Sequence, residues 1–419
     1  MDVFFKELGQ KVLSRWKQEN FSLEKFPGIA SAALDEQRPS DNVDLAALMR
    51  EFLLNDDQPL QTQSGFGQPE IVAYEHPKFY IQLLFWLDGT TDIHQHEFSG
   101  AFHVLSGSSI HAHFVFENAT SITPHFRVGD VRMKQIELLE MGRTVPIISG
   151  SRCIHSLFHL DTPSVTVVVR TQNDPGTAPQ FNYLPPHVAL DPVYNDTLTM
   201  RRKQLLDVLE HMGDTEYPEL ARQMIADLDF ERGFFILQHA MGHLRDLDPE
   251  LSEWQATLDA FGAKHGSPAA GIPLTLEECV RRDLIAGLRG RITAPEHRFF
   301  LALLLNVPTK TDLLALVAQR FPGEPPVETV LRWIEELVEQ TDFGIAILDA
   351  CFPEDLDVDL EDQPELFLAI LRHSLTEVPP ASGKGKKAPN PLKGIPATLV
   401  KRLQAVLADS SLRLLTQKS

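Results

Sequence analysis

TTDIHQHEFSGAFHVLSG, residues 90–107, decides the fold because it places two histidines side by side in a predicted strand. His94 and His96 stand two residues apart, and side chains at that spacing leave the same face of an extended backbone. Their two imidazoles therefore converge on one point. Ten of the sixteen histidines lie between His76 and His187, which concentrates potential metal ligands in this part of the chain.

The sequence around this pair has the texture of short strands. From Ile71 to Thr171, β-branched and aromatic runs such as SIHAHFVFE and SVTVVVRT are separated by Gly, Pro and Asp. Strands at this spacing predict an antiparallel sandwich or barrel. Closure of a barrel brings residues about 60 apart in sequence together. His155, which resumes a strand after the turn marked by Pro146 and Gly150, is the predicted third ligand.

Apolar residues at helical spacing frame the strand region on both sides. We expect an α+β multidomain chain, with a helical N-terminal extension over residues 1–62, a β-barrel over 63–190 and an all-α C-terminal domain over 191–419. A stretch rich in Pro, Gly and Lys, about residues 378–396, predicts a flexible linker within the helical part.

The overall charge argues against two classes of partner. With 38 basic and 58 acidic residues the formal net charge is −20, so neither nucleic acid nor an anionic membrane is expected to bind. No apolar run approaches the ~20 residues of a membrane-spanning helix. The cysteines, Cys153, Cys279 and Cys351, lie far apart in sequence. A disulfide framework and a thiolate zinc site are therefore not expected, which favours a cytoplasmic protein.

The order of the two histidine motifs resembles the cupin superfamily over residues 79–172. The first motif reads Gly89, His94, His96, Ala101 and Gly107, and the second reads Pro146, Gly150, His155 and His159. The resemblance implies a cupin-type antiparallel β-barrel, a double-stranded β-helix. Ala101 stands where many cupins carry a carboxylate ligand, so a site of three histidines with open coordination positions is implied.

Such a site looks like that of cysteine dioxygenase and its thiol dioxygenase relatives, which bind Fe(II) with three histidines. The Trp-x-x-Gly formed by Trp86 and Gly89 also matches that family, as does Ser99, three residues after His96. The resemblance implies an iron-dependent oxidoreductase, a dioxygenase, whose partners are a small-molecule substrate such as a thiol and O2.

Two departures from that family leave the substrate open. The family's substrate-carboxylate arginine lies on strands before the histidine pair, and this chain has no arginine between Arg50 and Arg127. The Ser-His-Tyr relay after the third ligand is replaced by Val168, Arg170 and Gln172. The residues that we expect to line a substrate pocket are Tyr80, Gln82, Ser99 and Arg170. Gln82 or Arg170 would take the place of the missing anchor, although a paired or solvated arginine is an equal alternative.

Two further histidines are candidates for catalysis or for supporting the ligands. His159 holds the motif's asparagine position and is expected to hydrogen-bond near the ligands. His103, two residues after Ala101, should share its strand face and point into the barrel as an acid, a base or a substrate contact. The alternative for His103 is a core histidine bonded to the backbone.

Two other histidine pairs are predicted to lie outside any site. His111 and His113 repeat the HxH spacing, but the opposite face of their strand is apolar, so we expect the histidines to face away from the core. His239 and His243 lie four apart in a predicted helix without a partnered carboxylate, which favours a packing or surface role.

Three functions fit these motifs. The first is a mononuclear Fe(II) oxygenase. The second is a ligand-binding or sensor module, whose helical C-terminal domain would contact a protein partner. The third is a hydrolase or isomerase that uses Zn, Ni or Mn, because imidazole ligands alone do not choose among these metals.

Overall fold

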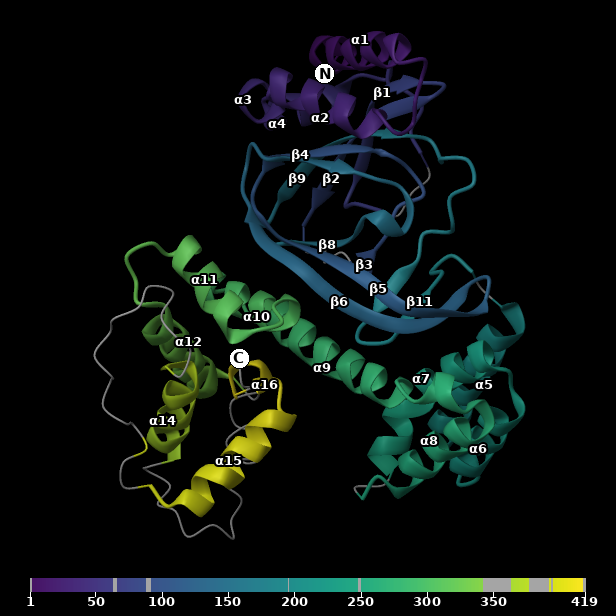
Figure 1. Ribbon diagram of the computed structural model, residues 1–419, viewed down its shortest axis with the longest axis vertical. Helices are drawn as coiled ribbons and strands as arrows, with labels where there is room; N and C mark the ends of the chain where they lie inside the picture. The colour runs from purple at the N-terminus through teal and green to yellow at the C-terminus, as the bar shows by residue number, and fades with distance from the viewer. Residues whose placement is uncertain are drawn as a thin grey trace.

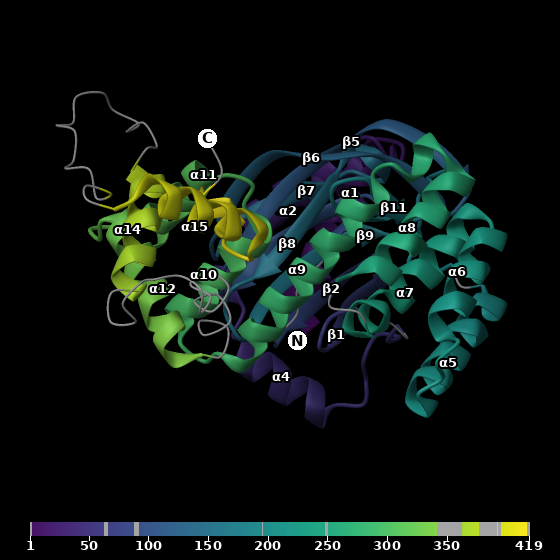
Figure 2. The same ribbon diagram turned by 90° about the horizontal axis from the view of Figure 1, so that it is seen from below.

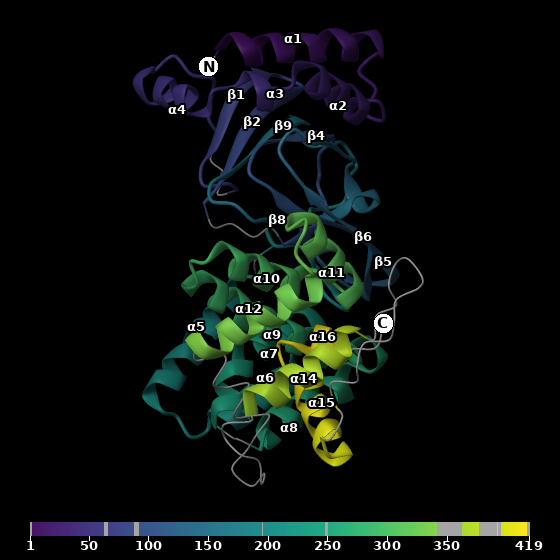
Figure 3. The same ribbon diagram turned by 90° about the vertical axis from the view of Figure 1, so that its left-hand side faces the viewer.

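The computed structural model of the 419-residue chain describes residues 2–62, 66–87, 92–194, 196–247, 250–341, 363–376, 392 and 395–416. Gly89, Cys351 and nearly all of the predicted linker over 378–396 lie outside these residues. N-terminal helices, strands and C-terminal helices follow one another along the chain, and Figures 1 and 3 show them as three layers. The domain boundaries at 62/63 and 190/191 stay predictions.

The N-terminal helices cover one outer face of the barrel. They are α1 (Asp2–Gln18), α2 (Phe26–Gln37), α3 (Pro39–Asn42) and α4 (Leu45–Leu54). Phe5, Leu8 and Trp16 are buried against alternate residues of the second strand, among them Phe79 and Ile81. The odd-numbered residues of that strand therefore point out of the barrel toward these helices.

The strands described in the chain form two antiparallel sheets. They are β1 (Glu70–His76), β2 (Phe79–Trp86), β3 (Ile93–His94), β4 (Gly100–Ser106), β5 (Ser109–Thr123), β6 (Phe126–Leu139), β7 (Thr144–Ile147), β8 (Ile154–His159), β9 (Ser164–Thr171), β10 (Asn182–Leu184) and β11 (Val188–Leu190). One sheet has the order β1-β2-β9-β4-β7, and the other closes as β10-β11-β6-β5-β8-β3. The predicted antiparallel barrel is confirmed.

Two glycines of β4 and its following turn are required by the backbone. A Cβ at Gly100 would lie 2.1 Å from the carbonyl oxygen of Val169, so no larger residue fits where β4 pairs with β9. Gly107 has φ +79, a left-handed conformation that favours glycine, and it begins the turn into β5. Gly100 thus lets β4 pair with β9, and Gly107 turns the chain into β5 at the other end of β4.

The C-terminal helices cover the other outer face. They are α5 (Thr197–Met212), α6 (Tyr217–Asp227), α7 (Phe230–Leu247), α8 (Ser252–His265), α9 (Ile272–Arg291), α10 (Pro295–Asn306), α11 (Lys310–Arg320), α12 (Pro326–Gln340), α14 (Gln363–Thr376), α15 (Ala397–Asp409) and α16 (Arg413–Thr416). Helix α9 runs beneath the barrel and links the α5–α8 group to the α10–α16 group (Figure 2). Within the described residues no helix combines the length and the apolar composition that crossing a membrane demands.

Apolar side chains join the barrel wall to these helices. Ile110 of β5, Leu138 of β6 and Phe158 of β8 are buried in one cluster with Leu288 of α9 and Phe299 of α10. The apolar face of β5 thus points outward, into a helical cover. The histidines on its other face point inward, contrary to the sequence prediction.

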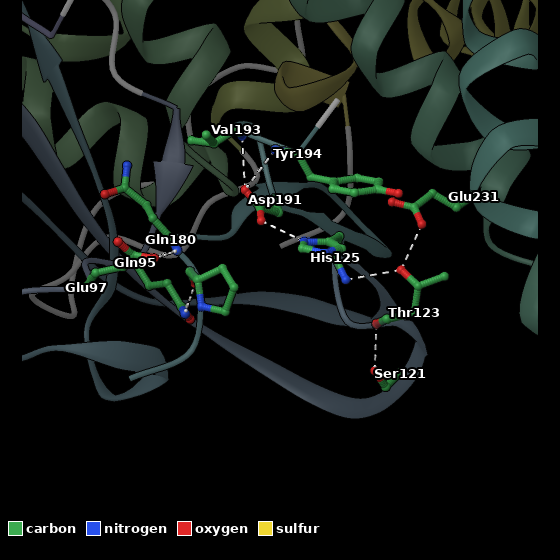
Figure 4. Close-up of polar contacts among 11 residues, drawn as sticks. Gln95, Glu97, Ser121, Thr123, His125, Gln180, Asp191, Val193, Tyr194 and Glu231 are labelled. Carbon is green, nitrogen blue, oxygen red and sulfur yellow. Dashed lines mark hydrogen bonds and ion pairs between the residues drawn. The ribbon is translucent and has the colours of Figure 1, made fainter. Parts of the chain in front are cut away.

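A polar junction ties the tip of the β5–β6 hairpin to the start of the helical half (Figure 4). His125 lies 2.8 Å from Asp191 and its ring stacks on Tyr194 at 3.9 Å between centroids. Thr123 donates a hydrogen bond to Glu231 of α7 at 2.8 Å. Asp191 and Tyr194 lie in the connection between β11 and α5, and Glu231 lies in α7, so the hairpin tip is fastened to both.

Candidate metal centre

Three histidines from two neighbouring strands meet inside the barrel. His94 of β3 lies directly opposite His155 of β8 in the antiparallel pair, and His96 follows two residues after His94. One ring nitrogen from each histidine lies within 4.8 Å of the other two, and all three side chains are buried. The sequence prediction that these three residues come together agrees with this geometry, and metal binding by them is developed as a proposal below.

Hydrogen bonds on the outer side of the rings determine which nitrogens face the centre. His94 Nδ1 lies 2.7 Å from the carbonyl oxygen of Asp92, so it carries the hydrogen and leaves Nε2 as a free lone pair. The Nε2 atoms of His96 and His155 lie 2.8 Å apart. Two nitrogens bound to one metal at ~2.1 Å and at right angles stand about 3 Å apart, so this spacing is close to that of two ligands.

Burial keeps the three rings neutral, which is the state that a metal requires. It lowers the pKa of His94. The pKa values of His96 and His155 fall well below the ordinary 6.5, because burial is reinforced by the neighbouring His94. Neutral imidazoles of this kind suit iron, zinc, nickel or copper, and the donor set therefore fits a divalent metal.

No carboxylate joins this cluster among the described residues, but not for the reason expected at Ala101. Ala101 packs with the N-terminal helices on the outer face of β4. Phe102, on the opposite face of the strand, points into the barrel beside the histidines. A carboxylate ligand is absent from this part of the barrel because the inward positions are occupied by Phe98, Gly100 and Phe102.

His103 does not reach the cluster. Its Nδ1 lies 2.8 Å from the hydroxyl of Thr144, and the amide of Ser40 in α3 lies 3.4 Å from its Nε2. It therefore shares the outer face with Ala101, as predicted, but that face looks toward the N-terminal helices and not into the barrel. The expected position of His103 inside the barrel is wrong, and the alternative of a buried, bonded histidine describes it.

His159 lies inside the barrel on the same strand face as His155, four residues further along β8. Its ring stacks on Trp86 at 4.6 Å, and its Nδ1 lies 3.0 Å from the hydroxyl of Ser164. Burial lowers the pKa of His159 to about 3. Its contacts support Trp86 of the cavity wall, and none of them joins a ligand histidine.

A cavity of about 330 Å³ opens from the three histidines toward solvent. Its apolar wall is made by Phe66, Leu84, Trp86, Phe98, Phe102, Ile147, Leu157 and Val168. Its polar wall is made by Thr62, Glu70, Tyr80, Gln82, Thr166, Arg170 and Gln180. A volume near the lower end of the ~300–1,000 Å³ that ligand sites span suits a small molecule.

Arg170 is the one arginine or lysine among the residues that line the cavity, which also include the carboxylate of Glu70. Its guanidinium carbon lies 3.4 Å from the centroid of Phe98 and 5.0 Å from that of Tyr80, so the cation is held between two rings. No carboxylate of the described residues lies within 4.0 Å of it. Its Nε donates to the carbonyl oxygen of Thr171 at 3.3 Å. Its remaining N–H groups have no hydrogen-bond acceptor among the described residues.

The other predicted pocket residues divide into two groups. Tyr80 and Gln82 line the cavity, as Arg170 does, and the buried Oε1 atom of Gln82 has no partner among the described residues. Ser99 does not line it, because its hydroxyl bonds to the carboxylate of Asp174. An unpaired buried acceptor favours a ligand that donates a hydrogen bond beside Arg170.

The loop after β9 is tied to the segment that carries the histidine pair (Figure 4). Gln95 donates from Nε2 to the carbonyl oxygen of Pro179 at 2.8 Å, and the Tyr183 hydroxyl donates to Gln95 Oε1 at 2.7 Å. Glu97 accepts from the amide of Gln180 at 3.3 Å. The residues that flank His96 in sequence thus hold Gln180 at the cavity rim.

The sequence prediction missed His111. It is fully buried, and its Nε2 lies 3.0 Å from His155 Nδ1, on the side of that ring away from the cluster. His113, two residues on, shares this inward face and is half-buried. The second HxH spacing was the sequence signal for these two histidines. The expectation that they face away from the core failed because helices cover the apolar face of β5.

Comparisons with known proteins give no family. A scan against protein-family models finds no match to this sequence, and a search of curated proteins also finds none. Parts of the chain are similar to solved structures. The DMSP lyase DddQ from Ruegeria pomeroyi DSS-3 is 17% identical over 42% of this chain and 95% of that chain, with a TM-score of 0.23.

Two further solved structures share a smaller part of the chain. Hydroquinone 1,2-dioxygenase from Sphingomonas sp. TTNP3 with 4-hydroxybenzoate bound is 9% identical over 26% of this chain and 68% of that chain, with a TM-score of 0.20. The protein TT1209 from Thermus thermophilus is 18% identical over 27% of this chain and 92% of that chain, with a TM-score of 0.19. At these TM-scores the likenesses assign neither a reaction nor a substrate.

Proposed function

We propose that this chain is a mononuclear, Fe(II)-dependent cupin oxygenase that acts on a small organic anion, a thiol carboxylate among the candidates. One observation carries the proposal. Three neutral, buried histidines lie in the wall of a cavity, and the same wall contains the guanidinium of Arg170, which has no carboxylate partner among the described residues. The barrel would then be a double-stranded β-helix of the cupin type, and the cytoplasm its compartment.

The chain's own groups would bind and orient the substrate. Arg170 would accept the anionic end of the substrate in a charge-assisted hydrogen bond, with its plane fixed by Phe98 and Tyr80. Gln82 Oε1 would accept a hydrogen bond from a hydroxyl, thiol or amine of the same molecule. The apolar wall would exclude water from the reacting end.

His94, His96 and His155 would hold the metal by their Nε2 atoms. When bound, Fe(II) supplies the one-electron redox chemistry that O2 requires and that amino-acid side chains lack. Phe98 and Phe102, which stand where a carboxylate ligand would otherwise point inward, leave coordination positions open on the cavity side.

The test is metal analysis of protein purified without a metal-binding tag, followed by anaerobic Fe(II) loading and an oxygen electrode. We expect about one iron per chain and oxygen uptake with one or more small thiols or aromatic acids. The His94→Ala variant should lose the oxygen uptake and the iron held by His96 and His155, and the exposed His211→Ala variant should lose neither. Protein that binds no divalent metal would overturn the proposal.

A sensor module is the second candidate, favoured by one observation. Every residue that lines the cavity lies between Thr62 and Gln180, so the helices α5–α16 contribute none. A helical half that builds no part of the site suits transmission to a protein partner. If small acids stabilise the iron-loaded protein against heat but cause no oxygen uptake, the sensor candidate is favoured. If metal analysis finds Zn, Ni or Mn at the histidine site, a hydrolase or isomerase is favoured.

A further inference from the structure

A second cluster of metal-ligand side chains lies directly behind His155. His111 and His113 of β5 and Glu137 of β6 each offer one ligand atom, and these atoms lie within 4.8 Å of one another. Their convergence follows from register, because His111 is paired with Glu137 across the β5–β6 ladder and His113 follows two residues later on the same face. Two imidazoles and one carboxylate are a ligand set for Zn, Fe, Mn or Ni.

The contacts that compete for the ligand atoms of this cluster are long or absent among the described residues. His111 Nδ1 is buried and lies 3.5 Å from Glu137 Oε1, at the limit of a hydrogen bond. No hydrogen-bond partner of His113 is described, and burial holds its pKa at about 4, which leaves the ring neutral. Glu137 also meets Arg143 at 3.7 Å, but the Arg143 side chain is 64% exposed and can turn to solvent without leaving a buried charge.

The two clusters share one hydrogen-bonded contact, between His155 Nδ1 and His111 Nε2 at 3.0 Å. One hydrogen lies between these atoms. When His155 Nε2 binds a metal, its hydrogen must sit on Nδ1 and is donated to His111 Nε2. A neutral His111 then carries its own hydrogen on Nδ1, facing Glu137, and that nitrogen has no lone pair for a second metal.

The opposite arrangement also satisfies the contact between His111 and His155. With a metal on His111 Nδ1, the hydrogen of His111 sits on Nε2 and is donated to His155 Nδ1. The hydrogen of His155 then sits on Nε2 and is donated to His96 Nε2, 2.8 Å away in the first cluster. Each ring keeps one hydrogen in both arrangements, so neither state requires a proton to be gained or lost.

We propose that His111, His113 and Glu137 form a second divalent-metal site, and that the paired tautomers of His111 and His155 make occupation of the two sites mutually unfavourable. Metal at the second site would turn an Nε2–H toward the first site and deprive it of a ligand. The second site is therefore the weaker one in the loaded protein and becomes available when the first cannot fill. It lies on the side of His155 away from the substrate cavity.

Equilibrium dialysis against Co(II), with the visible spectrum of the bound ion, tests this proposal. The His94→Ala chain, which lacks one ligand of the first site, should still bind one Co(II) with a spectrum different from that of the wild type. Adding His113→Ala or Glu137→Gln to that chain should weaken binding at least tenfold, while adding the exposed His211→Ala should not. Glu137→Gln is an isosteric change at a side chain that is 30% exposed, so it provides the test if the histidine variant does not fold.

The coupling has its own measurement. The second site should bind Co(II) at least tenfold more tightly in His94→Ala than in wild-type protein whose first site is already filled. A His94→Ala chain that binds no Co(II), or one whose affinity is unchanged by His113→Ala and Glu137→Gln, would overturn the second site. Equal affinities of the second site in both backgrounds would overturn the coupling. These outcomes are separate from the oxygenase proposal, which fails only if the wild type binds no metal or turns over nothing.

Discussion

The guanidinium of Arg170 stacks on the ring of Phe98, with 3.4 Å between the guanidinium carbon and the ring centroid. This contact sets the plane of the cation at the cavity wall, since a guanidinium that lies flat on a ring directs its N–H groups sideways. A lysine at the same position would keep the charge but lose both the plane and the paired donors.

Substitution of Arg170 therefore tests whether the cavity selects anions. With benzoate as the probe and neutral benzamide as its control, Arg170→Gln should weaken benzoate binding about 10- to 100-fold, the range of one hydrogen bond to a charged group. Arg170→Lys should restore only part of the affinity. Isothermal titration with metal-loaded protein measures all four combinations of variant and ligand. Equal loss of benzoate and benzamide binding would mean that the arginine shapes the cavity without reading charge.

His111 should stabilise metal at the first site by holding His155 in the tautomer that exposes Nε2. Loss of such an outer partner typically costs about 10- to 100-fold in metal affinity. We expect His111→Gln to weaken Zn(II) binding by this factor in competition with a chromogenic chelator. His103→Gln is the matched control, because His103 is equally buried but bonds to Thr144 outside the barrel. If both variants weaken binding to the same extent, the effect is general destabilisation.

Strand periodicity could not have placed Ala101 and His103 from the histidine pair. Residues 95–99, which join β3 to β4, are not in a strand, so the alternation that starts at His94 is interrupted before β4 begins. The sequence interpretation relied on a family motif, which located the three histidines but placed Ala101 on the ligand face of β4. Within β4, Ala101 and His103 share the outer face and Phe102 points inward.

His111 was misassigned for a different physical reason. An apolar strand face normally marks the core, and Ile110 and Ala112 led to the inference that His111 pointed to solvent. At the start of β5, over residues 109–112, both faces are buried, because helices α9 and α10 cover the apolar side and the barrel interior holds histidines. The local sequence of β5 does not indicate that helices cover this face, because the covering residues lie more than 150 positions after Ile110 in the sequence.

The helical cover makes a quantitative prediction about Ile110. Its side chain is fully buried among residues of the helical half, so Ile110→Ala should lower the free energy of unfolding by about 2–5 kcal/mol. Leu205→Ala, at a site 63% exposed on α5, should change it by less than about 0.5 kcal/mol. Urea unfolding measures both. A small effect at Ile110 would mean that the helices do not pack on the barrel wall in solution.

His159 should make the barrel sensitive to mild acid. Burial holds its pKa at about 3 in the folded chain, far below the 6.5 of an unfolded one. Between these values the unfolded state binds a proton that the folded state does not, so stability is full above pH 6.5 and falls as the pH drops. The slope for one such group is about 1.4 kcal/mol per pH unit.

His159→Asn keeps a side chain that can bond to Ser164 and removes the titration. Between pH 7.5 and pH 5.5, urea unfolding should show a smaller loss of stability in this variant than in the wild type, by about 1.4 kcal/mol, the loss that one such group causes over this interval. The exposed His211→Asn should leave the wild-type difference unchanged. Parallel losses in all three proteins would mean that acid acts through other buried histidines.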